Sequence, residues 1–267
     1  MVLPEPLILV LVILLGLAAG SFANVCILRI PAEMSVIRPG SRCLACGRSI
    51  LWRDNIPLVS FLLLRGRCRW CGGRISPRYP FIEALTCLAF VDIYLRFGAG
   101  LPVVVYCLLV LDVIIVSGID WDHMWIPRSL SIPGIPIGLA VAFCVWFFDL
   151  PGEWLVDHPL EAVVGGCVGG GFIWLARIAG GWYFKKEAMG LGDVDLMAFL
   201  GTFLGWQQVL LAIFLAALVG SLSGIMAWLL RDKLVRIPFG PYLGLGMYIC
   251  ILYGAEIWLW LFGGPYV

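Results

Sequence analysis

The run of apolar residues LILVLVILLGLAAGSFANVCIL (7–28) is long enough to cross a lipid bilayer as a helix, and comparable runs recur along the chain. A bilayer-spanning helix needs about 20 predominantly apolar residues. The further runs lie at about 81–97, 101–118, 131–148, 160–178, 194–206, 208–230 and 238–262. This pattern predicts an all-α polytopic membrane protein with about eight transmembrane helices. The run at 194–206 is short enough to be a tilted, re-entrant or half-crossing helix.

Composition supports a membrane protein. Of the residues, 62% are hydrophobic and only 13% are charged, and the mean hydropathy is +1.00. Soluble domains average about one quarter charged residues, so the chain does not belong to that class. The net charge of +1 gives no indication of nucleic-acid binding. The first apolar run is too long for a signal-peptide core and has no basic region before it, so we expect a retained span.

The basic residues divide the loops into two classes. Ten arginines lie within 29–78. Seven more basic residues stand in alternate later loops: Arg128, Arg177, Lys185, Lys186, Arg231, Lys233 and Arg236. Only Arg96 falls on the opposite side. Lys and Arg are concentrated in cytoplasmic loops, so we expect these loops in the cytoplasm and both termini outside.

The polar insertion at 29–78 separates three predicted regions. A first transmembrane helix covers 1–28, a cytoplasmic domain covers 29–78, and a helical transmembrane domain covers 79–267. Within the last of these, the glycine-rich patch GGCVGGG (165–171) lies inside a predicted span. Small residues in that position let helices approach closely, and we favour this role over phosphate binding.

Four cysteines give the insertion a metal-site pattern. Cys43, Cys46, Cys68 and Cys71 form two C-x2-C pairs separated by 21 residues. Two such pairs present four thiolates to one tetrahedral zinc ion. The alternative is two disulfides, which a reducing cytoplasm disfavours. A closed four-thiolate site is structural in most proteins, so we expect zinc to hold the fold of this small domain.

Two aspartates stand at the cytoplasmic ends of predicted spans. Asp120 lies in IDWDHMWIP (119–127), and Asp193 lies in GLGDVDLM (190–197). The predicted topology brings both to the same membrane depth. Gly190 and Gly192 allow an unusual backbone before Asp193 and leave room for another backbone to pass. Two carboxylates that meet share one proton and activate water, which is the chemistry of an aspartyl protease.

Other interpretations of the acidic residues remain open. Each aspartate of the pair could instead cap a helix. A transporter or channel would use intramembrane carboxylates to bind or relay ions, and Asp112 in mid-span fits that picture. A scaffold with a zinc module that docks partners is a further rival, but it gives no reason for GLGD. Asp122 and Asp195 lie two residues beyond the pair, on other sides of their helices.

The chain resembles the bacterial type IV prepilin peptidases from end to end. Besides the two aspartate motifs, the similar segments are GLAAGSFANVCILRIP (16–31), residues 41–83 around the cysteines, and IPFGPYLGLG (237–246). The resemblance implies that Asp120 and Asp193 are the catalytic pair of a GxGD-type aspartyl protease. It also implies the bacterial inner membrane as location, with lipid around the helices and the active site facing the cytoplasm.

The resemblance further implies a bifunctional enzyme. Members of the family cleave the basic leader of prepilins and pseudopilins after a glycine, for type IV pilus or type II secretion assembly. They then methylate the new N-terminus with S-adenosylmethionine as donor. Methylation goes with the cysteine-containing region, and the retained cysteines disfavour a peptidase that has lost it.

The resemblance also bears on single residues. Gly66 matches a position tied to methylation. Glu83 is a second methylation-linked candidate, and Asn24, Asp54 and Arg78 are further polar candidates for binding the methyl donor. Many members carry lysine where this chain has Asp195, and we expect Asp122 and Asp195 to receive the basic leader. Neither the residues nor the resemblance indicates an oligomeric state.

Overall fold

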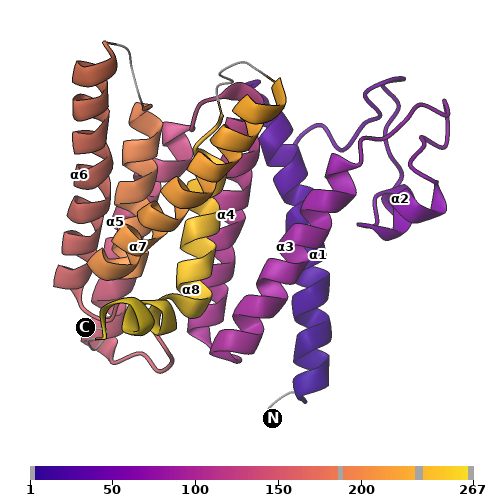
Figure 1. Ribbon diagram of the computed structural model, residues 1–267. Coiled ribbons are helices and arrows are strands. Elements are labelled where there is room, and N and C mark those ends of the chain that lie inside the picture. Colours follow the sequence, from indigo (N-terminus) through magenta and orange to yellow (C-terminus); the bar gives the residue numbers. More distant parts are fainter. Residues whose placement is uncertain (1–3, 186–188, 232–236, 264–267) are drawn as a thin grey trace. The chain divides into compact units, whose positions relative to one another are not determined.

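The computed structural model describes residues 4–185, 189–231 and 237–263 (Figure 1). Over these residues the fold contains helices and no strand. The elements are α1 (Glu5–Arg29), the 3₁₀ turn η1 (Trp52–Asp54), α2 (Val59–Leu63), α3 (Arg78–Phe97), α4 (Leu101–His123), α5 (Arg128–Phe148), α6 (Pro159–Phe184), α7 (Leu191–Arg231) and α8 (Gly240–Phe262). The predicted all-α class is confirmed.

Among the described residues, six helices are long and apolar enough to cross a membrane, namely α1, α4, α5, α6, α7 and α8. These are the helices of a multi-pass membrane protein. Helix α7 has 41 residues, about twice the length that one crossing needs. Its backbone is broken at Gly205, where φ is 75° and ψ is 171°. The predicted spans 194–206 and 208–230 are therefore two arms of one kinked helix, and the count of eight spans stays a prediction.

Two of the basic residues expected in cytoplasmic loops stand at helix ends. Arg128 is the first residue of α5, and Lys185 follows α6 directly. Lys186, Lys233 and Arg236 lie outside the described residues. The cytoplasmic placement of the basic loops therefore stays an expectation from the sequence.

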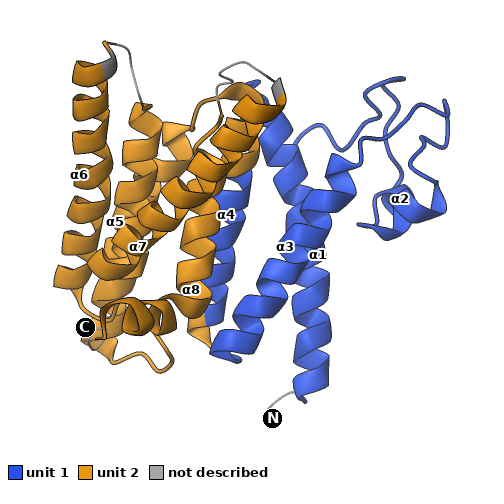
Figure 2. Cartoon of the chain, in the orientation of Figure 1, with its two compact units in different colours: residues 1–99, 103–115 blue, residues 100–102, 116–267 orange. Residues whose placement is uncertain are grey.

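The chain divides into two compact units (Figure 2). Unit 1 comprises Met1–Ala99 and Val103–Ile115. Within it, α1 and α3 approach closely through two glycines of α1. A Cβ atom on Gly16 would lie 2.8 Å from the Cα of Cys87, and one on Gly20 would lie 2.7 Å from the Cα of Glu83. The absence of side chains at these positions is what lets the two helices pack backbone to backbone.

Unit 2 comprises Gly100–Pro102 and Val116–Val267. Helix α6 packs along α7, and four glycines of the patch at 165–171 make the contact: Gly165, Gly166, Gly169 and Gly170. The fifth, Gly171, has open space where a Cβ would be. The predicted role of this patch in close helix packing is confirmed for the four glycines that contact α7.

Replacing Gly165 with alanine is expected to lower stability by about 1–3 kcal/mol, because overpacking shifts the backbone. The new Cβ would collide with the carbonyl oxygen of Gly201 and lie 2.9 Å from the Cα of Gly205. Thermal unfolding in detergent measures the effect. Gly171→Ala in the same helix is the matched control and should keep the wild-type midpoint. Equal midpoints for both variants would contradict the packing account.

Candidate functional site

The four predicted zinc ligands converge in unit 1. Their Sγ atoms all lie within 4.8 Å of one another, and those of Cys43 and Cys71 are 3.9 Å apart. A tetrahedral zinc with Zn–S bonds of about 2.3 Å separates its sulfurs by about 3.8 Å. All four thiols are free, so the geometry fits one shared zinc ion and gives no support to two disulfides.

The two cysteine pairs have the same local structure. The Gly47 N–H donates to the carbonyl of Cys43 (2.8 Å), and the Gly72 N–H donates to the carbonyl of Cys68 (2.9 Å). Each glycine directly follows the second cysteine of its pair and has a positive φ, 71° and 67°. Glycine adopts this conformation without steric cost. The sequence C-x2-C-G therefore builds two similar knuckles that face one point.

The surroundings of the first knuckle favour a thiolate. Backbone N–H groups of Cys46 and Ala45 lower the pKa of the Cys43 thiol to about 7. Zinc binds the thiolate form of cysteine. The knuckle thus offers at least one sulfur whose backbone surroundings favour the form that zinc binds.

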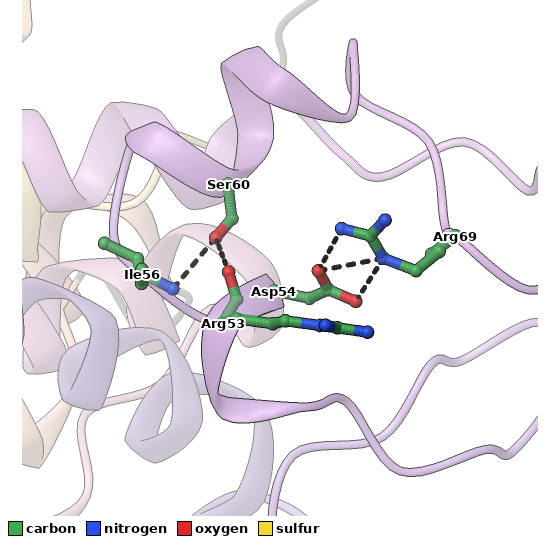
Figure 3. A network of polar contacts seen from close by, with 5 residues as sticks. All are labelled: Arg53, Asp54, Ile56, Ser60 and Arg69. Carbon is green, nitrogen blue, oxygen red and sulfur yellow. Dashed lines mark hydrogen bonds and ion pairs between the residues drawn. The ribbon is translucent and has the colours of Figure 1, made fainter.

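The segment between the knuckles is held by a polar network (Figure 3). The Arg69 guanidinium donates three hydrogen bonds of 2.6–3.0 Å to the Asp54 carboxylate. These bonds lower the pKa of Asp54 and tie η1 to the second knuckle. The Ser60 hydroxyl accepts a bond from the Ile56 N–H and donates one to the Arg53 carbonyl, each 3.0 Å long. Asp54, a sequence candidate for methyl-donor binding, is part of this network.

Gly66 turns the chain from α2 into the second knuckle. Its φ is 66°, its N–H donates to the Phe61 carbonyl (2.9 Å), and its carbonyl accepts from the Ile75 N–H (2.7 Å). A side chain at this φ is strained. Glycine is therefore needed at this position for the shape of the segment 29–78 that carries the four cysteines, here called the cysteine domain.

Glu83 and Asn24 are buried between α1 and α3. One oxygen of Glu83 accepts the N–H of Leu58 (2.8 Å), which precedes α2. The Asn24 amide donates to the carbonyls of Gly20 (3.2 Å) and Tyr79 (3.1 Å). Glu83 therefore connects the cysteine domain to the α1–α3 pair.

Asp120 lies in the last turn of α4, in the part that belongs to unit 2, and is buried. Its Oδ2 accepts the N–H of Gly240 (2.7 Å), the first residue of α8. A Cβ on Gly240 would lie 2.8 Å from that oxygen, so glycine makes the contact possible. The capping alternative therefore applies in part: Asp120 caps α8, not its own helix.

Asp193 is also buried and lies in the first turn of α7. Its Oδ2 accepts the N–H of Gly190 (3.1 Å), a bond that caps the start of the helix. Neither Gly190 nor Gly192 has a positive φ, so the left-handed region plays no part here and the expected unusual backbone stays a prediction. The expected close passage of another backbone is confirmed, since a Cβ on Gly192 would lie 3.0 Å from the carbonyl oxygen of Ile126.

The structure brings the two aspartates into one region of unit 2. Ile126, which contacts Gly192, follows Asp120 in the loop between α4 and α5. The carboxyl groups of Asp120 and Asp193 are near enough to interact electrostatically. Two buried carboxyl groups in such a pair can share one proton and activate a water molecule.

The other acidic residues behave differently. Asp195 forms an ion pair with Arg128, with 2.7 Å between Oδ2 and Nε. It is therefore engaged, which counts against the expected role of receiving the leader. Asp122 is exposed near the end of α4. Asp112 belongs to unit 1, and its Oδ2 is buried with no hydrogen-bond partner among the described residues.

Two partners of the site, Gly240 and Arg128, were not predicted from the sequence. Both lie in segments that are notable for other reasons, IPFGPYLGLG (237–246) and the alternate basic loops. A signal for Arg128 existed in its charge, opposite to that of Asp195. Nothing local identifies Gly240 as a donor to Asp120.

Comparison with known proteins gives two family matches. The family described as "Bacterial Peptidase A24 N-terminal domain" matches residues 14–97, and the family described as "Type IV leader peptidase family" matches residues 107–225. These matches cover the cysteine domain and the aspartate pair in turn. No solved structure matches the chain significantly.

Curated relatives named "Prepilin leader peptidase/N-methyltransferase" occur in several bacteria. The protein from Myxococcus xanthus is 40% identical over 85% of this chain and 65% of its own length. The Pseudomonas putida protein is 33% identical over 91% of this chain and 90% of its own. The Pseudomonas aeruginosa protein is 35% identical over 95% and 93%. The chain thus spans just under two thirds of the first relative and nearly all of the other two.

Proposed function

The chain belongs to the type IV leader peptidase family, and on this premise we propose that it cleaves the leader of type IV prepilins and pseudopilins after a glycine and methylates the new N-terminus. The observation that carries the proposal is the pair of buried, interacting carboxyl groups of Asp120 and Asp193. A helix-capping role alone does not require two buried carboxyl groups to lie within electrostatic range of each other.

In the proposed cleavage, the pair holds one proton between its two carboxyl groups. The ionised carboxylate removes a proton from water, which attacks the carbonyl carbon of the glycine, while the protonated group donates its proton to that carbonyl oxygen. As the tetrahedral intermediate collapses, the C–N bond breaks, the new amine takes the proton that was removed from water, and a hydroxyl proton returns to the other carboxylate, so that the leader leaves with a free carboxyl group. The N–H groups of Gly240 and Gly190 orient the carboxyl groups for these transfers.

The proposed location is the bacterial inner membrane, with the aspartate pair open to the cytoplasm. The distribution of Lys and Arg among the loops supports this orientation. In this arrangement the hydrophobic helix of the prepilin stays in lipid, and its leader reaches the pair from the cytoplasmic side.

The proposed methyl transfer belongs to unit 1. S-adenosylmethionine supplies the methyl group when it is bound. The four cysteines hold a structural zinc that fixes the cysteine domain, and their Sγ distances support this role. Gly66 shapes the same domain, while Glu83 ties it to α1 and α3, so we assign both to positioning for methylation.

Gly192→Ala is expected to reduce the rate of leader cleavage by about a hundredfold, because a displacement of about 1 Å at a reacting group has an effect of this size. The added Cβ would lie 2.7 Å from the Cβ of Ile126 and push the start of α7 away from the loop after α4. Initial rates on a purified prepilin measure the change.

The matched control for Gly192→Ala is Gly171→Ala in α6, where the added Cβ meets nothing within 4 Å. It should cleave at the wild-type rate. A Gly192→Ala enzyme with a rate within about twofold of wild type would show that the close approach does not position Asp193.

A further inference from the structure

We propose that the ion pair of Arg128 and Asp195 positions the second catalytic aspartate against the first. The inference rests on the proposed cleavage by Asp120 and Asp193. It assigns to Arg128 and Asp195 a role that acts through Asp193, without contact between the pair and the substrate.

The ion pair connects the start of α5, which follows Asp120 in the chain, with the helix that carries Asp193. Arg128 is the first residue of α5, and the α4–α5 loop joins it to the helix that carries Asp120. Asp195 lies two residues after Asp193 at the start of α7. The 2.7 Å contact between Arg128 Nε and Asp195 Oδ2 therefore ties the chain after the first aspartate to the helix of the second.

A second contact works together with this ion pair. Ile126 lies against Gly192, directly before Asp193 in the sequence. Pro127, between Ile126 and Arg128, has an extended backbone with φ −67° and ψ 115°. The short segment 126–128 thus contacts α7 at residues on both sides of Asp193. Two contacts resist a rotation or a sliding of the first turn of α7 better than one contact does.

The exposure of the ion pair separates positioning from stability. The side chain of Arg128 is 60% exposed and that of Asp195 is 19% exposed. Ion pairs at this exposure contribute little to folding stability. Small displacements of reacting groups, in contrast, change rates by large factors. Loss of the pair should therefore appear in the cleavage rate while the unfolding midpoint changes little.

Binding of the basic leader by Asp195 is the competing role, and it predicts effects of a different kind. In that case Arg128 would compete with the leader for the carboxylate. Removing Arg128 would lower KM for basic leaders, and removing Asp195 would raise KM for basic leaders only. In the positioning role, either change lowers kcat for every leader, because the geometry of Asp193 is disturbed.

The test compares Arg128→Asp, Asp195→Arg, the double exchange and Arg128→Lys in liposomes. Each is assayed on a prepilin with its basic leader and on one whose leader charges are neutralised. We expect kcat to fall about tenfold in each reversed single variant, with KM within about twofold on both substrates. The double exchange restores the pair with opposite polarity and should recover kcat to within about threefold of wild type, and Arg128→Lys should retain most of it.

Three outcomes would overturn the inference. One is a wild-type kcat in both single variants, and another is a double exchange no better than the singles. The third is a change confined to KM for the basic leader, which would assign Asp195 to leader binding. If instead wild type cleaves no prepilin, or Asp120→Asn and Asp193→Asn still cleave, the proposed function fails. That failure is distinguishable because it does not depend on Arg128 or Asp195.

Discussion

Asp193→Asn is expected to abolish leader cleavage, and Asp120→Asn is expected to do the same. Asparagine keeps the size of the side chain and can still accept the backbone N–H bond from Gly190 or Gly240. It cannot carry the negative charge or exchange the proton on which the pair depends. General acid–base catalysis contributes about 10²–10⁴-fold for one group, so losing either should reduce the rate at least that much. Release of the leader from a prepilin in liposomes measures it.

Two controls accompany the aspartate variants. Asp157→Asn changes an exposed aspartate in the loop before α6 and should cleave normally. Both variants of the pair should still methylate a pilin supplied without its leader, because we assign that reaction to unit 1. If either variant of the pair cleaves at the wild-type rate, the assignment is wrong, and Asp112 and Asp122 become the residues to examine.

Cys43→Ser combined with Cys46→Ser is expected to remove zinc and methyl transfer together. Two of four ligands are lost, and a structural zinc contributes about 10–16 kcal/mol of apparent binding free energy that maintains its domain. Methylation should fall by roughly a hundredfold or more, while cleavage by the pair in unit 2 is largely retained. Metal analysis of the purified protein and the mass of the pilin product report the two effects.

Cys167→Ser is the matched control for the cysteine variant. Cys167 is exposed on α6 and lies outside the four-sulfur cluster. It should keep one zinc per chain and full methylation. A double serine variant that has lost its zinc but still methylates at the wild-type rate would refute a structural role of the metal in this reaction.

Features that depend on local spacing were predictable from the sequence. The four cysteines are the clearest example, because C-x2-C followed by glycine determines the knuckle by itself. The glycine patch at 165–171 was also interpreted correctly, since small residues inside an apolar span have few other uses. The placement of Asp120 and Asp193 in one region followed from an alternation of helices with short loops.

Features that depend on distant contacts were not predictable. The kink at Gly205 makes one helix of two expected spans, and no proline marks the break. The bond from Gly240 to Asp120 joins residues 120 positions apart, and the ion pair of Arg128 and Asp195 joins residues 67 positions apart. Side chains that meet across a bundle are chosen by packing, which a single sequence does not display.

The most direct test of the central claim is the mass of a prepilin after incubation in liposomes with the wild-type protein and S-adenosylmethionine, with Asp193→Asn as the parallel reaction. We predict that wild type yields a product that has lost the leader after its glycine and gained one methyl group, and that Asp193→Asn leaves the prepilin intact. A prepilin left intact by wild type, or cut equally by both proteins, would contradict the assignment of leader cleavage to the pair formed by Asp120 and Asp193.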